Sequence, residues 1–299
     1  MSTSSAVTAP TTAPAATGLA SAGEFSVRRR VSTRLLRSEL GMVFRRRRNL
    51  AMFAVLAAFP ILIGVAVKLS TPSGNEGPAF LGQITENGLF LGFTSLVVVL
   101  PLFLPLAVAV VSGESSAGEA NLGTLRYLLV VPVSRTRLLL VKYAAVVAYG
   151  FAATLLVAAV GVVAGALLFP VGPVTLLSGS TVAFSSALVR ALLVALYVGA
   201  MLAAVGAIGM FLSTLTEVPI GAMAATAIVT IICEIFDAIP QLSAIHSYLF
   251  PHWWLSFGDL LRQPILTSEL YRGLLTAAIY VAIFLSLAWA RFVTRDVSS

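Results

Sequence analysis

Long runs of apolar residues, separated by short polar segments, dominate the pattern of this chain. Six of the runs approach or exceed the roughly 20 residues that a helix needs to cross the hydrocarbon core of a bilayer. They predict membrane-spanning helices at residues 49–69, 88–111, 137–169, 185–212, 218–238 and 272–292. Pro60, Pro101 and Pro105 predict kinks in the first two helices, because proline removes a backbone donor and crowds the preceding turn.

The longer connections predict two different structures. Residues 170–184 carry Pro, Gly and Ser and predict a loop. Residues 239–271 are semi-apolar and predict short helices that either dip into the outer leaflet or cap a cavity. Five aromatic residues there favour an interfacial belt: Tyr248, Phe250, Trp253, Trp254 and Phe257.

The N-terminal part divides into two segments. Residues 1–26 are rich in Ser, Thr, Ala and Pro and predict a disordered cytoplasmic tail. Residues 27–48 hold nine arginines, and apolar residues between Leu35 and Phe44 recur at helical spacing. This pattern predicts an amphipathic helix on the lipid headgroup surface, although a simple block of positive charge before the first span would also explain the arginines.

A polar segment, residues 112–143, interrupts the apolar pattern after the second span. Ser116 precedes Glu119 by three residues, the spacing of a capping box that begins a helix. A leucine stripe follows, Pro132 would end the helix, and Ser134 would cap the next one. The pattern predicts a short amphipathic helix, a turn and re-entry into the membrane; the plainer alternative is a solvated connector.

Composition and charge place the chain in the membrane class. Hydrophobic residues make up 59% and charged residues 10%, whereas soluble domains carry about 25% charged residues. Fifteen of the 19 Lys and Arg residues lie in the N-terminal segment, residues 112–142 or the C-terminus. The positive-inside rule assigns these three regions to the cytoplasm, so the net charge of +7 needs no nucleic-acid partner.

Candidate catalytic and metal chemistry is sparse in the sequence. The chain has no Gly-Lys dipeptide and therefore no phosphate-binding loop, and it has no H-E-x-x-H motif. His246 and His252 have no nearby carboxylate or Cys at metal-ligand spacing in the sequence, so we expect no metal site. Cys233 is expected to be a small buried hydrophobe, and we expect no enzymatic activity in this chain.

Two further features leave alternatives open. Arg190, Glu234 and Asp237 are predicted near the outer ends of the fourth and fifth spans, where they form either a structural charge pair or a gate. Small residues between Gly199 and Gly209 would let another helix approach closely. That helix belongs either to this chain or to a second copy.

The polar segment resembles the cytoplasmic loop of ABC-2-type transporter permeases. The resemblance rests on Glu114, Glu119, Gly123-Thr124, Leu128, Pro132, Ser134-Arg135 and Lys142, which occur in the family's order. It extends to the layout of residues 27–299, with a basic amphipathic helix, six spans and partly inserted segments before the last span. Asn121-Leu122, immediately before Gly123, departs from the family's pattern.

The resemblance implies an all-α integral membrane protein with six transmembrane helices, an N-terminal interface helix and a cytoplasmic coupling helix between spans 2 and 3. It implies the membrane subunit of an ATP-driven exporter in a bacterial plasma membrane, with both termini cytoplasmic and a hydrophobic or amphiphilic substrate such as a drug, lipid or peptide. The partners would be an ATPase subunit, which binds the ATP and Mg²⁺, and a second permease copy or paralogue. By resemblance the coupling residues are Glu114, Glu119, Gly123, Thr124, Arg126, Pro132 and Arg135. The alternative is an ATP-independent secondary carrier or a membrane assembly protein.

Overall fold

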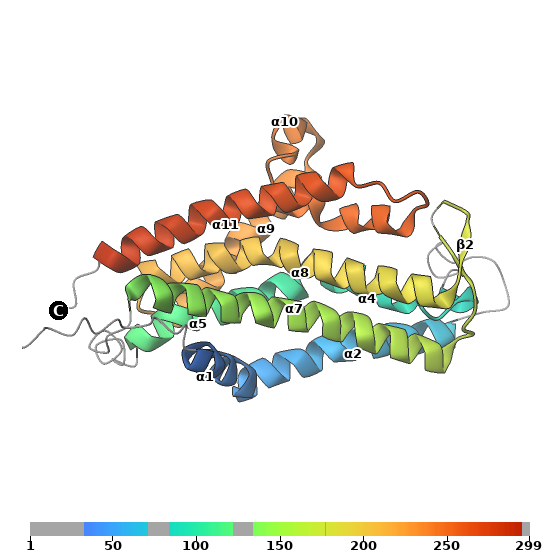
Figure 1. The fold of residues 1–299 in the computed structure, drawn as a ribbon, viewed down its shortest axis with the longest axis horizontal. Coiled ribbons are helices and arrows are strands. Elements are labelled where there is room, and N and C mark those ends of the chain that lie inside the picture. The colour runs from blue at the N-terminus through green and yellow to red at the C-terminus, as the bar shows by residue number, and fades with distance from the viewer. Residues whose placement is uncertain (1–32, 71–83, 122–133, 177, 295–299) are drawn as a thin grey trace, which may run out of the picture. The chain divides into compact units, whose positions relative to one another are not determined.

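Helices account for nearly all of the regular structure in the computed structural model, which describes residues 33–70, 84–121, 134–176 and 178–294 (Figure 1). The long helices are α2 (Arg47–Ser70), α7 (Arg135–Leu168), α8 (Phe184–Leu215), α9 (Pro219–Ala238) and α11 (Ser268–Thr294). The shorter ones are α1 (Thr33–Arg45), α4 (Phe90–Val99), α5 (Phe103–Asn121), α10 (Ser243–His246) and the 3₁₀ segments η1 (Pro240–Leu242) and η2 (Phe250–Leu261).

The five long helices are each long and apolar enough to cross a membrane, and the bent pair α4 and α5 gives a sixth crossing if it is one span. Each predicted apolar run coincides with a helix or with this pair. Apolar side chains also cover much of the outer surface; Leu62, Leu167 and Ile220, for example, are more than 60% exposed. Such a surface suits lipid rather than water, so the chain is an all-α, multi-pass membrane protein.

The second apolar run is bent sharply rather than smoothly. α4 and α5 meet at an angle of 57° across a short break that contains Pro101. Proline has no N–H to continue the helical ladder, so the predicted kink at this residue is confirmed. α2 continues through Pro60 and α5 through Pro105 as single helices.

The capping box predicted at Ser116 is wrong, because α5 continues without interruption from Phe103 to Asn121. Ser116 and Glu119 therefore lie inside a helix and not at its start. The backbone N–H groups of Ser116 and Ala117 both reach the Ser213 hydroxyl at 2.9 Å, which ties α5 to α8. The predicted leucine-striped helix lies at residues 122–133, outside the described residues.

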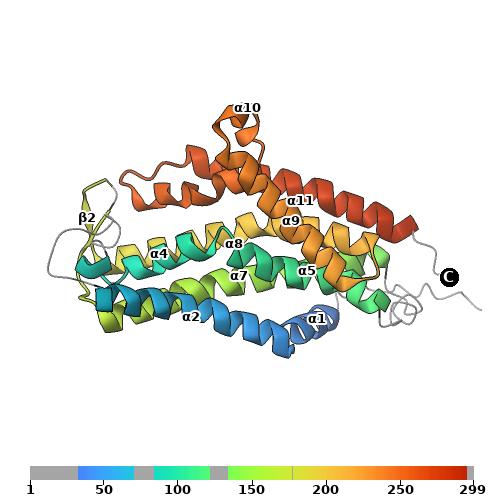
Figure 2. The same ribbon diagram turned by 180° about the vertical axis from the view of Figure 1, so that it is seen from behind.

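α8 is the central helix, since α5, α7, α9 and α11 all pack on it (Figure 2). Its small residues make this possible. A Cβ on Gly199 would lie 2.4 Å from the Phe151 ring of α7, and one on Gly209 would lie 1.9 Å from the Ser112 hydroxyl of α5. The glycines between residues 199 and 209 therefore serve packing within this chain.

The connection between α7 and α8 and the connection between α9 and α11 differ from the predicted loop and the predicted interfacial belt. Residues 170–184, predicted as a loop, contain a two-stranded antiparallel ladder, β1 (Val174–Thr175) and β2 (Thr181–Val182). Short helices occur between α9 and α11 as predicted. However, Phe250, Trp253, Trp254 and Phe257 are buried against the helices, whereas Tyr248 is 72% exposed. The aromatic cluster is thus core, fixed in part by the Tyr197 hydroxyl, which donates to the Trp253 carbonyl at 2.8 Å.

Candidate functional site

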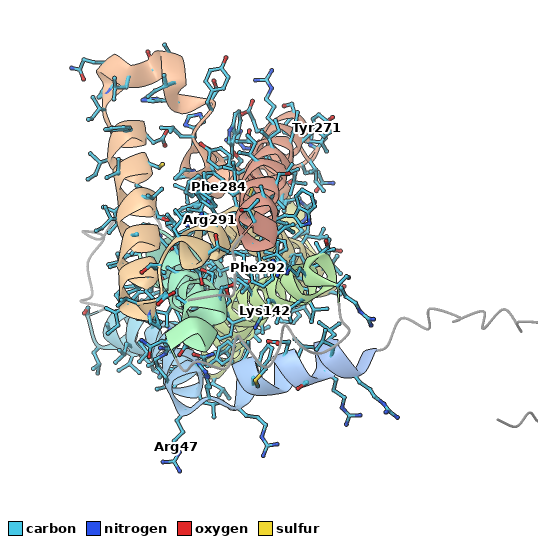
Figure 3. All side chains as sticks on the ribbon, turned by 90° about the vertical axis from the view of Figure 1, so that its left-hand side faces the viewer. Arg47, Lys142, Tyr271, Phe284, Arg291 and Phe292 are labelled. Carbon is cyan, nitrogen blue, oxygen red and sulfur yellow. The ribbon has the colours of Figure 1, made fainter. Side chains whose placement is uncertain are left out.

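Many of the charged residues of the described chain gather at one end of the helices. α1, the C-terminal end of α5, the first turns of α7 and the last turns of α11 lie there (Figures 1 and 3). The Trp289 indole donates to the Thr136 hydroxyl at 2.8 Å and joins α11 to α7. The described parts of the three regions that the positive-inside rule assigned to one face of the membrane therefore share one end of the protein (Figure 1).

A pocket of about 420 Å³ opens at this end between α1, α5 and α7. We call it the α1 pocket. Its apolar lining comes from residues such as Leu35, Val111 and Val146. Its polar lining comprises Ser38, Glu39, Arg46, Asn49, Glu114, Ser115 and Lys142.

A buried ion pair crosses the α1 pocket. The Lys142 ammonium lies 3.4 Å from the Glu39 carboxylate, and the two side chains are only 3% and 8% exposed. Charges removed from water to this degree are tolerated only when they are paired and hydrogen-bonded. Figure 3 shows Lys142 inside the bundle, whereas Arg47 extends away from it. The pair fastens α1 to α7.

A second set of ion pairs holds the corner between α1 and α2. Arg46, at the junction of the two helices, and Arg48, in the first turn of α2, each pair with one oxygen of Glu114 on α5. Glu114 is 21% exposed and the arginines are near 44%. One carboxylate near the end of α5 thereby fixes the entry of α2.

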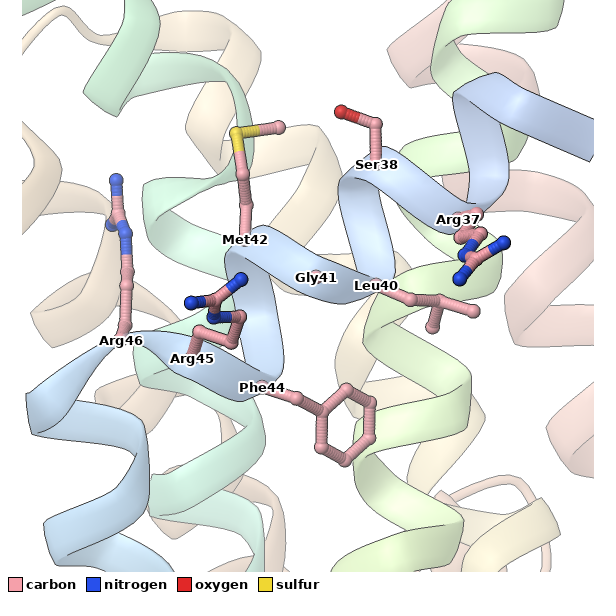
Figure 4. Close-up of a pocket in the computed structure, with 8 residues that line it drawn as sticks. All are labelled: Arg37, Ser38, Leu40, Gly41, Met42, Phe44, Arg45 and Arg46. Carbon is pink, nitrogen blue, oxygen red and sulfur yellow. The ribbon is translucent and has the colours of Figure 1, made fainter.

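α1 presents different chemistry on its other faces. A surface hollow along the helix carries the guanidinium groups of Arg37, Arg45 and Arg46 (Figure 4). Phe44 turns to the bundle and stacks on Phe53 at a ring separation of 5.8 Å. The predicted amphipathic helix is therefore present at Thr33–Arg45, but it ends before residue 48, because Arg47 and Arg48 already belong to α2.

The residues assigned to the coupling loop are only partly described. Gly123, Thr124, Arg126 and Pro132 lie outside the described residues, and of Glu119 only the backbone, within α5, is described. Glu114 lies in the ion-pair cluster. Arg135 donates to the Val293 carbonyl at 2.8 Å, so it caps the C-terminal end of α11, where helix carbonyls lack intrahelical donors.

The structure does not join Arg190 to Glu234 or Asp237. Arg190 on α8 donates to the backbone carbonyls of Leu260 and, at 3.0 Å, Arg262. Leu260 lies in η2, which packs against α8, and Arg262 directly follows η2. The predicted charge pair is therefore replaced by a contact with the end of η2. Within the described ranges no ion pair links Arg190 to either acid.

Asp237 instead lies beside both histidines. Its Oδ1 is 2.8 Å from Nδ1 of His252 and 3.9 Å from Nδ1 of His246. The expectation of no metal site assumed that no carboxylate was near, and this assumption is wrong. The carboxylate comes from α9, 9 and 15 residues earlier in the chain, so its distance in sequence hid it.

The sequence analysis also missed Glu39 as a site residue. One signal was available, because Glu39 is the one acidic residue in the arginine-rich segment 27–48. An acid in such a segment suggests a specific partner. The identity of that partner, Lys142, depends on how α1 folds back on α7.

Comparison with known proteins places the chain in a family without assigning an activity. No curated protein matches it. A family model described as "Protein of unknown function (DUF2705)" matches residues 61–298. The match covers most of the chain, from within α2 to beyond α11, and leaves α1 outside it. The chain therefore belongs to the family described as protein of unknown function, DUF2705.

Proposed function

We propose that the chain is the membrane subunit of an ATP-driven exporter of the ABC-2 type. In this proposal a separate ATPase subunit binds ATP and Mg²⁺ and acts on the segment between α5 and α7. A second permease copy or paralogue completes the transport path. The substrate is hydrophobic or amphiphilic, such as a drug, lipid or peptide, and the assembly works in a bacterial plasma membrane.

The observation that carries the proposal is that both helices flanking the segment 122–133, α5 and α7, are held by ion pairs about two turns away from it. On its α5 side, Glu114 pairs with Arg46 and Arg48. On its α7 side, Lys142 pairs with Glu39. A force applied to the segment would therefore pass into α1, α2 and α7 together. A solvated connector has no need of such fastening, whereas a transmitting element does.

The helix directions support a six-span topology. If α4 and α5 form one span, the end of α5, the start of α7 and the turn between α8 and α9 all lie at the end of the protein where α1 lies (Figure 1). The arginine-rich segments mark this end as cytoplasmic by the positive-inside rule. Both termini are then cytoplasmic, and the β1–β2 ladder and η2 face the outside.

The proposal is tested by purifying the full-length protein from native membranes in a mild detergent. We expect a subunit with a phosphate-binding loop to co-purify in a stoichiometric ratio. We also expect the purified complex to hydrolyse ATP, and the transported substrate to stimulate this hydrolysis. Repeated purification of the chain without any ATPase would refute the proposal.

Glu114→Gln tests the role of the cluster in the same complex. We expect the complex to assemble but to lose substrate-stimulated ATP hydrolysis, because the two arginines lose the carboxylate that couples the α1–α2 corner to α5. Glu269→Gln is the matched control, since Glu269 pairs with Arg272 at 3.7 Å on the exposed surface of α11. Normal stimulation in Glu114→Gln would exclude a coupling role for this residue.

Two observations favour the secondary carrier as a second candidate. Discontinuous helices and embedded carboxylates form the ion sites of such carriers. The chain has the bent α4–α5 pair, and Glu234 of α9 has a buried carboxylate oxygen with no hydrogen-bond partner among the described residues.

Proteoliposomes that contain this chain alone distinguish the two candidates. A carrier would move a hydrophobic dye when a proton or sodium gradient is imposed without ATP, and Glu234→Gln would abolish that movement by removing the ionisable group. The exporter proposal expects no gradient-driven movement in either protein. Movement that Glu234→Gln abolishes would replace the exporter by the carrier.

A further inference from the structure

The end of α9 brings together the only two histidines of the chain and an aspartate. Asp237 lies in the last turn of α9, His246 ends α10, and His252 lies in η2. One possible ligand atom from each residue lies within 4.8 Å of the others. Figure 1 shows α10 standing away from the long helices at the end of α9, so three separate elements converge here.

We propose that Asp237, His246 and His252 bind one divalent transition-metal ion, with zinc the best-matched ion. Two imidazole nitrogens and one carboxylate oxygen are ligands that zinc accepts in tetrahedral sites. Magnesium and calcium prefer shells built from oxygen alone. The proposal stands independently of the transport function.

The distances between Asp237 and the two histidines are near those between the ligand atoms of a tetrahedral zinc ion. Zinc–ligand bonds of about 2.0–2.1 Å place tetrahedral ligand atoms about 3.3 Å apart. Asp237 Oδ1 lies 2.8 Å from Nδ1 of His252 and 3.9 Å from Nδ1 of His246, values on either side of that spacing. Side-chain rotations would bring all three atoms around a common centre.

The hydrogen bond of His246 gives a second, independent indication. Its Nε2 lies 3.0 Å from the Ile239 carbonyl, and a carbonyl can only accept, so Nε2 carries the proton. In the tautomer whose only proton is on Nε2, Nδ1 has a free lone pair on the side of Asp237. Metal-binding histidines commonly donate their other ring N–H to a backbone carbonyl in this way, which fixes the tautomer and the ring orientation.

Exposure indicates where the fourth ligand would come from. His246 is 17% exposed and Asp237 25%, whereas His252 is 36% exposed. The side of His252 is therefore open to water or to an external ligand. An ion at this site would tie α9, α10 and η2 to one another. In its absence, His252 and Asp237 retain a simple hydrogen bond.

The test uses full-length protein with an affinity tag free of histidine, stripped of metal by a chelator. We expect Co²⁺ to produce the visible absorption bands of tetrahedral coordination, and Zn²⁺ to displace it at one ion per chain. Mg²⁺ and Ca²⁺ should leave the bands unchanged. Asp237→Asn and His252→Ala should each weaken zinc binding at least about tenfold. Mutation of a residue that only supports a metal ligand already lowers metal affinity by about this factor.

Two variants serve as controls. Asp259→Asn removes an aspartate of η2 that pairs with Arg262 at 3.4 Å, and Cys233→Ser removes the only thiol of the chain. Both should bind zinc as the unaltered protein does. No zinc binding, or equal binding by Asp237→Asn and the unaltered protein, would overturn the proposal.

A measurement on the unaltered protein covers the case in which a variant fails to fold. Diethyl pyrocarbonate modifies histidines, and both histidines of the chain belong to the proposed site. Saturating zinc should slow their modification, because a ring nitrogen that is bound to a metal ion has no free lone pair with which to attack the reagent. An unchanged rate of modification would count decisively against a zinc site here.

Discussion

Glu39→Gln is expected to lower the free energy of unfolding by about 1.5–3 kcal/mol, the typical contribution of a hydrogen bond to a charged group. Glutamine keeps the shape of the side chain but removes the charge that faces Lys142 at 3.4 Å. Lys142 is 3% exposed, so water cannot take over the role of the carboxylate. Thermal unfolding of the detergent-solubilised protein, followed by tryptophan fluorescence, measures the effect.

The double variant Glu39→Gln with Lys142→Met separates the charge effect from the packing effect. Replacing both members of a buried pair is often close to neutral, so the double variant should recover most of the loss. Glu269→Gln is again the control, because its pair with Arg272 is 44–65% exposed and such pairs contribute only about 0–1 kcal/mol. Equal unfolding temperatures for Glu39→Gln and Glu269→Gln would show that the buried pair is not important for stability.

Gly165→Ala is expected to be the second strongly destabilising change, because it forces α7 away from the start of α4. A Cβ on Gly165 would lie 1.9 Å from the Gly88 carbonyl oxygen, and a Cβ on Gly161 would lie 2.6 Å from the Gly92 Cα. Gly88 and Gly92, and Gly161 and Gly165, are each four residues apart, the spacing that lets membrane helices touch backbone to backbone. Overpacking of this kind costs about 1–3 kcal/mol, and more when backbone must move.

Gly41→Ala is the matched control for that change. Gly41 is also helical, in α1, but a Cβ there meets nothing within 4 Å. Alanine should be neutral or stabilise the helix by about 0.5–1 kcal/mol, because it restricts the unfolded chain more than glycine does. Thermal unfolding of both variants in the same detergent makes the comparison, and a Gly165→Ala protein as stable as Gly41→Ala would refute the close contact.

Several helix positions followed directly from the apolar runs. The predicted runs 137–169 and 218–238 correspond to α7, Arg135–Leu168, and α9, Pro219–Ala238. The agreement is physical, since a span must be both continuous and apolar to satisfy its backbone in lipid. The expected kink at Pro101 followed from the missing N–H of proline, whereas α2 and α5 continue through Pro60 and Pro105.

Predictions that depended on contacts between separate helices were less successful. Ser116 and Glu119 match a capping box in sequence, yet α5 passes through them, and the Ser116 and Ala117 amides contact Ser213 of the neighbouring α8. Trp253 and Trp254 match an interfacial belt in composition. They are nevertheless buried, because η2 folds back onto α8 and α11.

The sequence by itself determined that this protein is a bundle of membrane helices with its positive charge concentrated in a few segments, because length, hydropathy and charge are properties of each segment alone. Only the tertiary structure decided which charges meet. Glu39 with Lys142, and Asp237 with His246 and His252, are pairings between residues that are distant in the chain, or on separate elements. Such contacts depend on how helices pack against one another, and no local pattern of residues encodes that packing.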